Sequence, residues 1–380
     1  MKRYQSSGNL DCIVILADDL TGACDSGVAF LRCGRPVRVV LDGPGFDLES
    51  RLTATTKSDP VVWALTTETR DLPPDQAAER VTNSMATLAP ILKHALLFKK
   101  VDSAARGNCG VEISTVLRSS GAALALVAPA FPAAGRTVNS GILTVRDWSG
   151  QNAAILLRDL FPHEDANGIE VLPAGSAQQL EQGIAEALAK GTRLLLCDAA
   201  KQDDLERLAD AALRVQAPLL WAGSAGLAHA LANALPQAST NPVPRRKPDG
   251  GRTLLFVGTA HAVTSLQVAH LKQSSNGIDR AIHYIPCAAA SQQDVVAVFS
   301  AKPASALILT GGDTAAFVLR SLGASSLELA GEIARGIPWG FIEGGMADGC
   351  VVVTKSGGFG ERDVLVHAFE FCERRFCDPA

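Results

Sequence analysis

The amino-acid sequence predicts an α/β fold made of two α/β domains with largely parallel sheets. The chain has 380 residues, which is more than a single hydrophobic core usually serves. Short apolar runs alternate with Ala/Leu-rich stretches of helical character, which is typical of a parallel sheet covered by helices. The apolar runs are nearly continuous, and this indicates that both faces of the sheet are buried.

The expected strands form two series along the chain. Helical stretches such as 77–88 and 177–188 separate some strands of the first series. The first series is expected at residues 12–17, 61–65, 96–101, 124–128, 193–197 and 218–222. The second series is expected at residues 253–257, 306–310 and 351–354.

A linker is expected between the two series. Residues 241–251 read NPVPRRKPDGG, in which three prolines oppose helix and the charged residues favour contact with water. The sequence therefore predicts one domain over residues 1–240 and a second over residues 250–380.

Composition restricts the class of protein. Hydrophobic residues make up 47% and charged residues 19%, as in ordinary globular proteins, and no apolar run approaches the roughly 20 residues of a membrane span. The net charge of -4 argues against nucleic acid as the main partner. The nine cysteines form no CxxC pair, and residues 1–10 lack the apolar core of a signal peptide. A cytoplasmic protein without disulfides or membrane partners is expected.

Polar residues follow three strands of the first series. Asp18 and Asp19 follow the first strand, Arg70 follows the second, and Asp102 and Arg106 follow the third. Carboxyl ends of parallel strands form the usual ligand crevice of such sheets, so these residues are expected to converge. Adjacent carboxylates resist joint ionisation, so one of the pair is expected to have a raised pKa that suits proton abstraction.

The cationic residues of this group suit a small anionic substrate. Arg70, Lys100 and Arg106 are candidates to bind a carboxylate, which arginine can hold with two hydrogen bonds. The alternative for Asp18 or Asp19 is a purely local role, because aspartate routinely caps the helix that follows it.

Glycine-rich turns follow the strands of the second series. They comprise Gly258-Thr259, Gly311-Gly312-Asp313-Thr314 and Lys355 with Gly357-Gly358. Glycine lets phosphate oxygens approach backbone N–H groups, and Lys355 offers a charge for a phosphate. The alternative is that the glycines serve turn geometry alone, since the turns contain no Walker-type loop and no GxGxxG fingerprint.

Two further features carry no catalytic assignment. His261 lies at a strand end, where a single histidine is more often structural. The segment beginning Gly223-Ser224 lacks the G-x-S-x-G spacing of a nucleophile elbow, which disfavours a hydrolase.

The order of these motifs resembles the four-carbon acid sugar kinase family. The resemblance covers nearly the whole chain. It rests on Ala17–Ala23, Lys99–Ser103 with Arg106-Gly107, Ala128–Pro132 with Gly135–Thr137, Gly223–Ala228, Gly311–Ala315 and Thr354–Gly360. The chain departs from the family pattern at Thr259, where Ser is usual, and at Ala104-Ala105, where Thr-Leu is usual.

The resemblance implies a first domain that binds an acid sugar, a second that binds ATP, and an active site in the cleft between the domains. Family members phosphorylate the terminal hydroxyl of threonate, erythronate or oxo-tetronates. By carry-over, the substrate would contact Asp19, Arg70, Lys100, Val101, Asp102, Ser103 and Arg106. The nucleotide would contact Gly258, Thr259, Gly311, Gly312, Asp313, Thr314, Lys355, Gly357 and Gly358.

The resulting hypothesis is an ATP-dependent kinase in which Mg²⁺ neutralises the phosphates and the terminal, 4-hydroxyl group is the acceptor. Asp19 is the first candidate for the catalytic carboxylate, with Asp18 and Asp102 as alternatives. A catalytically silent sugar-acid sensor is the alternative function, and a dehydrogenase is disfavoured because its fingerprint is missing. A homodimer is the default expectation for a soluble enzyme.

Overall fold

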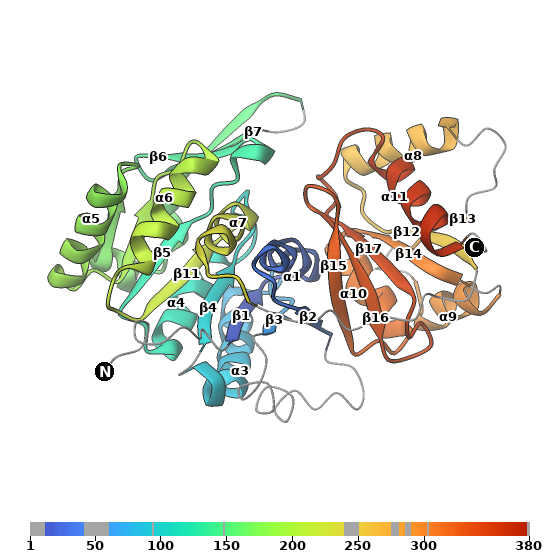
Figure 1. Ribbon diagram of the computed structural model, residues 1–380, viewed down its shortest axis with the longest axis horizontal. Helices are drawn as coiled ribbons and strands as arrows, with labels where there is room; N and C mark the ends of the chain where they lie inside the picture. Colours follow the sequence, from blue (N-terminus) through green and yellow to red (C-terminus); the bar gives the residue numbers. More distant parts are fainter. Residues whose placement is uncertain are drawn as a thin grey trace. The chain divides into compact units, whose positions relative to one another are not determined.

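The structure is a computed structural model that describes residues 12–41, 61–92, 95–146, 149–238, 251–274, 281–285, 290–301 and 304–377. The chain divides into two compact units (Figure 1). Unit 1 comprises residues 1–35 and 48–240, and unit 2 comprises residues 36–47 and 241–380. Residues 241–250 of the expected linker and the N-terminal residues 1–10 lie outside the described residues. The assignment of an acid-sugar and a nucleotide domain to 1–240 and 250–380 stays a prediction.

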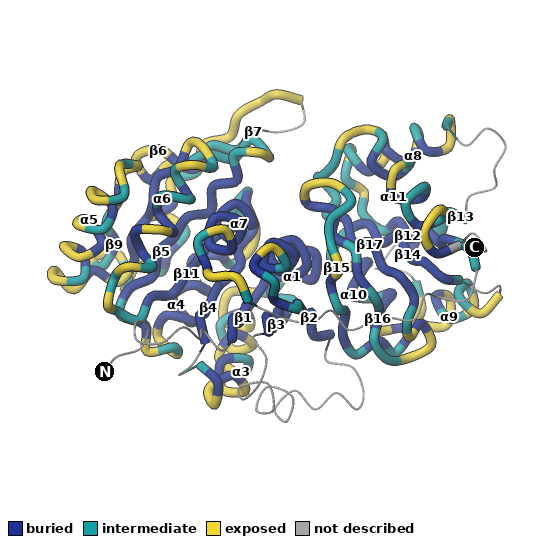
Figure 2. Tube along the Cα trace, viewed as in Figure 1, coloured by how far each residue is buried: buried dark blue, intermediate teal, exposed yellow. Residues whose placement is uncertain are grey.

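Unit 1 contains a parallel sheet in the strand order β3-β1-β4-β11-β5-β10-β9. Its strands are β1 (Cys12–Ala17), β3 (Val61–Thr66), β4 (Ala95–Lys100), β5 (Leu124–Ala128), β9 (Ile169–Leu172), β10 (Leu194–Cys197) and β11 (Leu219–Gly223). Every residue of β1 and β4 is buried, which fits the unbroken apolar sequence of β1 and of residues 95–98 in β4 (Figure 2).

The helices of unit 1 pack in two groups. Helices α3 (Pro74–Leu92) and α4 (Cys109–Ser120) contact each other. The other group contains α1 (Leu20–Gly27), α5 (Ala177–Lys190), α6 (Gln202–Leu213) and α7 (Ala225–Ala234), in which α5 contacts α6, α6 contacts α7 and α7 contacts α1. Because the strands of this sheet are mainly hydrophobic, both of its faces need such a helical cover.

A small antiparallel sheet also belongs to unit 1. It is formed by β6 (Arg136–Asn139), β7 (Ile142–Arg146) and β8 (Asn152–Leu156). These strands were not predicted from the sequence, because they are short and partly exposed.

Unit 2 contains a mixed sheet. Strands β13 (Ala281–Tyr284), β12 (Arg252–Val257), β14 (Ala304–Thr310) and β17 (Val351–Lys355) are parallel in that order. Strands β16 (Ile337–Glu343), β15 (Ser326–Ala334) and β2 (Val37–Val40) continue it with antiparallel pairing. The prediction of two α/β domains with largely parallel sheets is confirmed, and the antiparallel edge is an addition.

The helices of unit 2 are α8 (Ala262–Ser274), α9 (Gln292–Ser300), α10 (Gly312–Ser321) and α11 (Val364–Cys372). Helices α8 and α11 contact each other, and their apolar residues share a core with β12, β14 and β17. Within the described parts of both units, no helix is long and apolar enough to cross a membrane. The seven cysteines whose side chains are described are buried free thiols.

Close packing of β11 against β5 depends on Gly223. A Cβ atom at this position would lie 2.4 Å from the carbonyl oxygen of Ala128 and 2.8 Å from the side chain of Leu227. We expect Gly223→Ala to lower the free energy of unfolding by about 2 kcal/mol, since the backbone must shift. Urea denaturation checks this. The control is Gly175→Ala, where the nearest atom is the flexible Gln179 Oε1 at 3.1 Å. Equal losses in both variants would contradict the prediction.

Candidate active site

Asp18 and Asp19 lie at the carboxyl end of β1, where α1 begins. Asp19 is the N-cap of α1, because its Oδ1 accepts a hydrogen bond of 2.7 Å from the Gly22 N–H. Its Oδ2 accepts one of 2.8 Å from the Thr21 hydroxyl. The helix-capping role is therefore present at Asp19, and the same carboxylate has a second set of partners.

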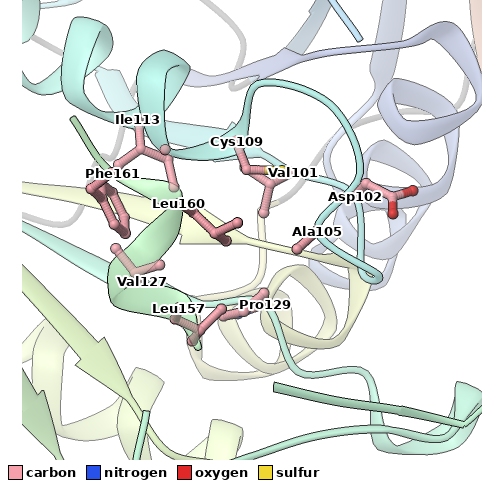
Figure 3. A pocket seen from close by; sticks show the side chains of 11 residues that line it. Val101, Asp102, Ala105, Cys109, Ile113, Val127, Pro129, Leu157, Leu160 and Phe161 are labelled. Atoms are coloured by element: carbon pink, nitrogen blue, oxygen red, sulfur yellow. The ribbon is translucent and has the colours of Figure 1, made fainter. Parts of the chain in front are cut away.

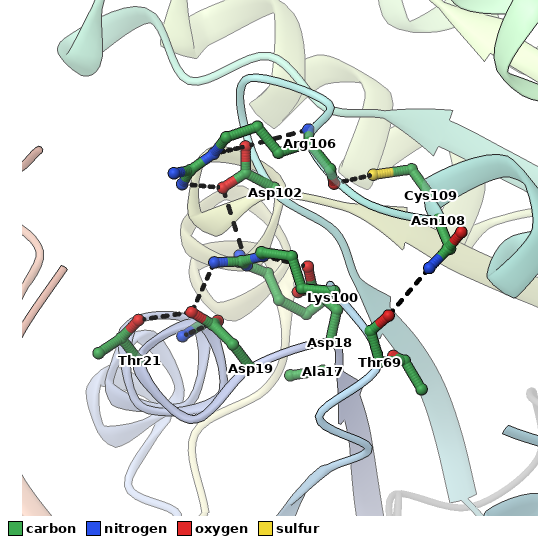
Figure 4. A network of polar contacts seen from close by, with 12 residues as sticks. Ala17, Asp18, Asp19, Thr21, Thr69, Lys100, Asp102, Arg106, Asn108 and Cys109 are labelled. Atoms are coloured by element: carbon green, nitrogen blue, oxygen red, sulfur yellow. Dashed lines mark hydrogen bonds and ion pairs between the residues drawn. The ribbon is translucent and has the colours of Figure 1, made fainter. Parts of the chain in front are cut away.

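Arg70 joins the ends of three strands. Its Nε lies 2.7 Å from Asp18 Oδ2, its Nη1 lies 2.6 Å from Asp19 Oδ2, and its Nη2 lies 3.7 Å from Asp102 Oδ2. Figure 4 shows the three aspartates in one region. The Arg70 side chain is only 15% exposed. The residues that follow β1, β3 and β4 thus form one polar cluster, which we call the carboxylate cluster: Asp18, Asp19, Arg70 and Asp102.

Arg106 borders this cluster from a tight turn. Its Nε and Nη2 donate to the two carboxylate oxygens of Asp102, at 3.0 and 2.6 Å. Asp102 Oδ1 also accepts from the backbone N–H of Ala104 at 2.9 Å, which fixes the turn. The Arg106 side chain is 57% exposed, so Arg106 is the cation of the group that most readily meets a dissolved anion.

Lys100 is a further cation beside the carboxylate cluster, and it is buried. A Cβ atom on Gly22 would lie 3.0 Å from Lys100 Nζ and 2.6 Å from Asp19 Oδ1, so the missing side chain leaves room for both. Val101 and Ser103 are buried beside these residues. All seven residues expected to contact the substrate therefore belong to β4 and the segments that follow β1, β3 and β4.

Two carboxylates of the cluster, Asp18 and Asp102, have lowered pKa values. Burial raises the pKa of Asp18, but the charges of Arg70, Lys100 and Lys99 outweigh it and leave that pKa below its usual 3.8. Burial likewise opposes ionisation of Asp102, yet hydrogen bonding and charge from Arg106 hold its pKa well below the usual value. The expected raised pKa is therefore wrong for Asp18, because a guanidinium lies between the neighbouring carboxylates.

A buried ion pair is connected to the cluster through Thr69. Lys99 Nζ lies 2.7 Å from Glu112 Oε2, and the two side chains are 0% and 1% exposed. Glu112 Oε1 accepts from the Thr69 hydroxyl at 2.8 Å, and Thr69 is the neighbour of Arg70. Sequence analysis missed Glu112 because it lies inside a helix, where a charged residue normally faces water.

Arg136 is a second residue that sequence analysis did not assign to the site. Burial lowers the pKa of Arg136, and the charges of Asp102 and Arg106 act on it as well. The side chain thus lies within electrostatic reach of the exposed side of the cluster. Its place in the Gly135–Thr137 motif was the available signal.

An apolar pocket lies next to Asp102 but does not suit a sugar acid. Its walls include Val101, Ile113, Leu160 and Phe161, and the Asp102 carboxylate points away from these side chains (Figure 3). A polyhydroxylated acid needs hydrogen-bonding partners, which the carboxylate cluster offers and this pocket does not.

In unit 2, three glycine-containing turns meet at Thr259. A Cβ atom on Gly311 would lie 3.2 Å from Thr259 Cβ, and one on Gly357 would lie 2.9 Å from Thr259 Oγ1. A Cβ on Gly258 would lie 2.2 Å from Thr314 Oγ1. The turns that follow β12, β14 and β17 therefore lie close together. Side chains on these glycines would keep the turns apart.

Gly312 and Asp313 open α10, and the preceding Gly311 has φ +94°, a conformation that favours glycine. Across the site, His261 stands before α8, and its Nδ1 accepts from the Val263 N–H at 3.2 Å. A Cβ on Gly358 would lie 3.2 Å from His261 Nε2. Among the residues described, no group of three or more His, Cys, Asp and Glu is arranged to hold a metal ion.

Lys355 lies beneath the last of these turns. Its Nζ donates to the carbonyl oxygens of Ser356, Gly357 and Phe359 at 2.8, 3.2 and 3.1 Å. Lys355 is fully buried, and burial lowers its pKa to about 7. The four oxygens around Nζ, including Thr264 Oγ1 at 3.2 Å, favour the ammonium form.

Two family models match this chain. Residues 13–231 match the model of a sugar-binding N-terminal domain, and residues 288–365 match that of a nucleotide-binding C-terminal domain. The chain is 30% identical to a D-threonate kinase of Bordetella bronchiseptica, over 96% of this chain and 98% of that protein. It is 28% identical to a D-threonate kinase of Salmonella typhimurium, over 96% and 99%. A solved structure from Salmonella typhimurium covers 94% of this chain and 98% of its own, with a TM-score of 0.67 at 21% identity, and so supports the fold alone.

A match to a sugar-binding domain model followed by a match to a nucleotide-binding domain model fits a small-molecule kinase. The chain belongs to the four-carbon acid sugar kinase family.

The lowered pKa of Asp102 predicts an acid-dependent loss of stability. Because its folded pKa lies below the unfolded value of 3.8, ionised Asp102 stabilises the fold above that pH. This contribution is lost as the pH falls through the folded pKa. We therefore expect Asp102→Asn to be less stable than wild type at pH 7, with a difference that shrinks progressively below about pH 5.

Urea denaturation at pH 7, 5, 4 and 3 measures this difference. The exposed residue Asp210 provides the matched control, as Asp210→Asn. A difference for Asp102→Asn that stays constant down to pH 3 would show that its charge does not supply the stabilisation.

Proposed function

We propose that this protein transfers the γ-phosphoryl group of ATP to the terminal, 4-hydroxyl group of a four-carbon acid sugar. The carboxylate cluster with Arg106 is the observation that carries the proposal. At the carboxyl ends of β1, β3 and β4, it offers cations that can bind a substrate carboxylate and carboxylates that can accept hydrogen bonds from substrate hydroxyl groups. Family membership supplies the substrate class: threonate, erythronate or an oxo-tetronate.

In the proposed complex, Arg106 binds the substrate carboxylate. It is the most exposed cation of the group, and its partner Asp102 keeps it in place. Arg136 lies near enough to add to the same positive field. Arg70 and Lys100 are enclosed and serve to keep Asp18 ionised.

Asp19 is proposed to accept the hydrogen bond, and finally the proton, of the reacting hydroxyl group, with Asp18 and Asp102 as alternatives. A weakly basic carboxylate suffices, because phosphoryl transfer depends mainly on positioning and on stabilising charge. Asp19 is held on both oxygens, by Gly22 and Thr21, so its orientation is fixed before substrate binds.

The nucleotide is proposed to bind at the converging glycine turns of unit 2. Gly258, Thr259, Gly312, Thr314, Gly357 and Gly358 would bind the phosphates through backbone N–H groups and hydroxyls. The N–H of Gly311 donates to the Lys355 carbonyl, so Gly311 would instead shape its turn. Mg²⁺ would arrive with ATP and neutralise its charge, with Asp313 on the first turn of α10 as a single carboxylate ligand. A site with one carboxylate and substrate phosphates is the usual arrangement for this ion.

The first test incubates the full chain with MgATP and a panel of D- and L-threonate, D-erythronate and the oxo-tetronates. ADP release is followed, and the position of the new phosphate is found by ³¹P NMR. Acid-dependent ADP formation with phosphate on the terminal oxygen is expected. Stabilisation by an acid without ADP formation would instead identify a sugar-acid sensor. The homodimer, the cytoplasmic location and the cleft between domains stay predictions.

Asp19→Asn tests the proposed carboxylate. Asparagine caps helices as well as aspartate does, so α1 is expected to persist. Loss of the proton acceptor is expected to lower kcat by about 10²-fold or more. Circular dichroism confirms the fold, and Asp210→Asn serves as control. A wild-type kcat in Asp19→Asn would contradict the assignment to Asp19 and would leave Asp18 or Asp102 as the proton acceptor.

Arg106→Gln tests the proposed carboxylate-binding residue. Loss of a charge-assisted pair is expected to raise the KM for the acid by about 10-fold or more and to leave the KM for MgATP unchanged. Steady-state kinetics with each substrate varied in turn gives both constants. An equal rise of both would show that Arg106 does not act on the acid.

A further inference from the structure

A polar network beneath the turn that follows β17 holds this turn in one conformation. The network consists of Lys355, Thr264 and Gln267, and all three side chains are buried. Besides the lysine contacts above, the Thr264 hydroxyl donates to the Gly357 carbonyl at 2.8 Å. Gln267 Nε2 donates to the carbonyls of Phe359, Gly360 and Glu361 at 3.1, 2.8 and 3.0 Å.

These contacts fix the direction of the peptide groups. In a planar trans peptide the C=O of one residue and the N–H of the next point in opposite directions. No cis peptide bond occurs among the residues described. Because the carbonyls of Ser356 and Gly357 point at Lys355 Nζ, the N–H groups of Gly357 and Gly358 point away from it.

The opposite side of the turn is the side of the proposed nucleotide site. Cβ atoms on Gly357 and Gly358 would meet Thr259 and His261, which border that site. Within the described part of the chain, the N–H groups of Gly357 and Gly358 donate to no backbone carbonyl. Two adjacent outward N–H groups are the elements of an anion-binding nest.

Lys355 itself is poorly placed to touch a phosphate. Its side chain is fully buried, and four oxygen acceptors surround the three hydrogens of its ammonium group. A direct phosphate contact would require the turn to come apart. Its positive charge instead attracts the carbonyl ends of the peptide dipoles, and the N–H ends face outward.

We infer that Lys355, Thr264 and Gln267 are positioning residues that orient the Gly357-Gly358 peptides toward the phosphates of the nucleotide. This inference rests on the proposed function and deepens it. It changes the role expected for Lys355, from a charge that contacts phosphate to a residue that acts through the backbone.

The test uses three variants of the full chain: Lys355→Met, Thr264→Val and Gln267→Met. The last two remove hydrogen-bond donors and no charge, so a direct ion pair with phosphate cannot explain any effect they have. Each is expected to raise the Kd for MgATP by tenfold or more, while the KM for the acid and the inhibition constant of adenosine change less than twofold. Lys272→Met removes an exposed charge from α8, the helix that carries Thr264 and Gln267, and is expected to match wild type.

The outcomes separate the inference from the function on which it rests. Wild-type protein that binds no MgATP would overturn the proposed function and this inference with it. Binding by wild type together with unchanged affinity in Thr264→Val and Gln267→Met would overturn the inference alone, even if Lys355→Met lost binding. Equal loss of adenosine, acid and MgATP would also overturn it, because the network would then only maintain the fold. If Lys355→Met does not fold, the other two variants decide.

Discussion

The guanidinium of Arg70 is the interaction on which the first site depends. Without it, three carboxylates at neighbouring strand ends would repel one another in a region that excludes water. The arginine is itself buried, and its position is set by the preceding residues, since Thr69 hydrogen-bonds to Glu112, which pairs with Lys99. Removal of one partner from such a buried pair is costly, about 3–5 kcal/mol, because it leaves an uncompensated charge. The site is therefore anchored through the sheet as well as through the loops.

The sequence predicted the parallel strands well because burial on both faces leaves a direct trace in composition. The runs at 12–17, 124–128 and 253–257 correspond closely to β1, β5 and β12. The trace disappears where a strand is exposed on one side or lies at an edge. Strand β2 has four residues, and it pairs with β15, nearly 290 positions later in the chain. No local pattern specifies so distant a partner.

In the candidate sites, strand order made the meeting of the residues predictable, whereas features that depend on side-chain geometry were not predictable from the sequence. Asp18, Arg70 and Asp102 were expected to converge because parallel strands end at one edge of their sheet. The sign of the pKa shift at Asp18 was not predictable, because it depends on whether a cation lies between the carboxylates or to one side. Glu112, Thr264 and Gln267 were missed because they lie on helices and face inward, where spacing alone does not separate a polar residue from its apolar neighbours.

The two units use buried cations in opposite ways. In unit 1, Arg70 and Lys99 face carboxylates, so their charges are neutralised within the protein. A ligand at this site would meet the oriented carboxylates and the exposed guanidinium of Arg106. In unit 2, Lys355 faces neutral oxygens and no carboxylate among the residues described. Its charge is therefore not cancelled there, and in our inference aligned peptide dipoles carry it outward. A net charge of -4 is thus compatible with the two proposed anion sites, because local arrangement rather than overall charge sets the potential at each site.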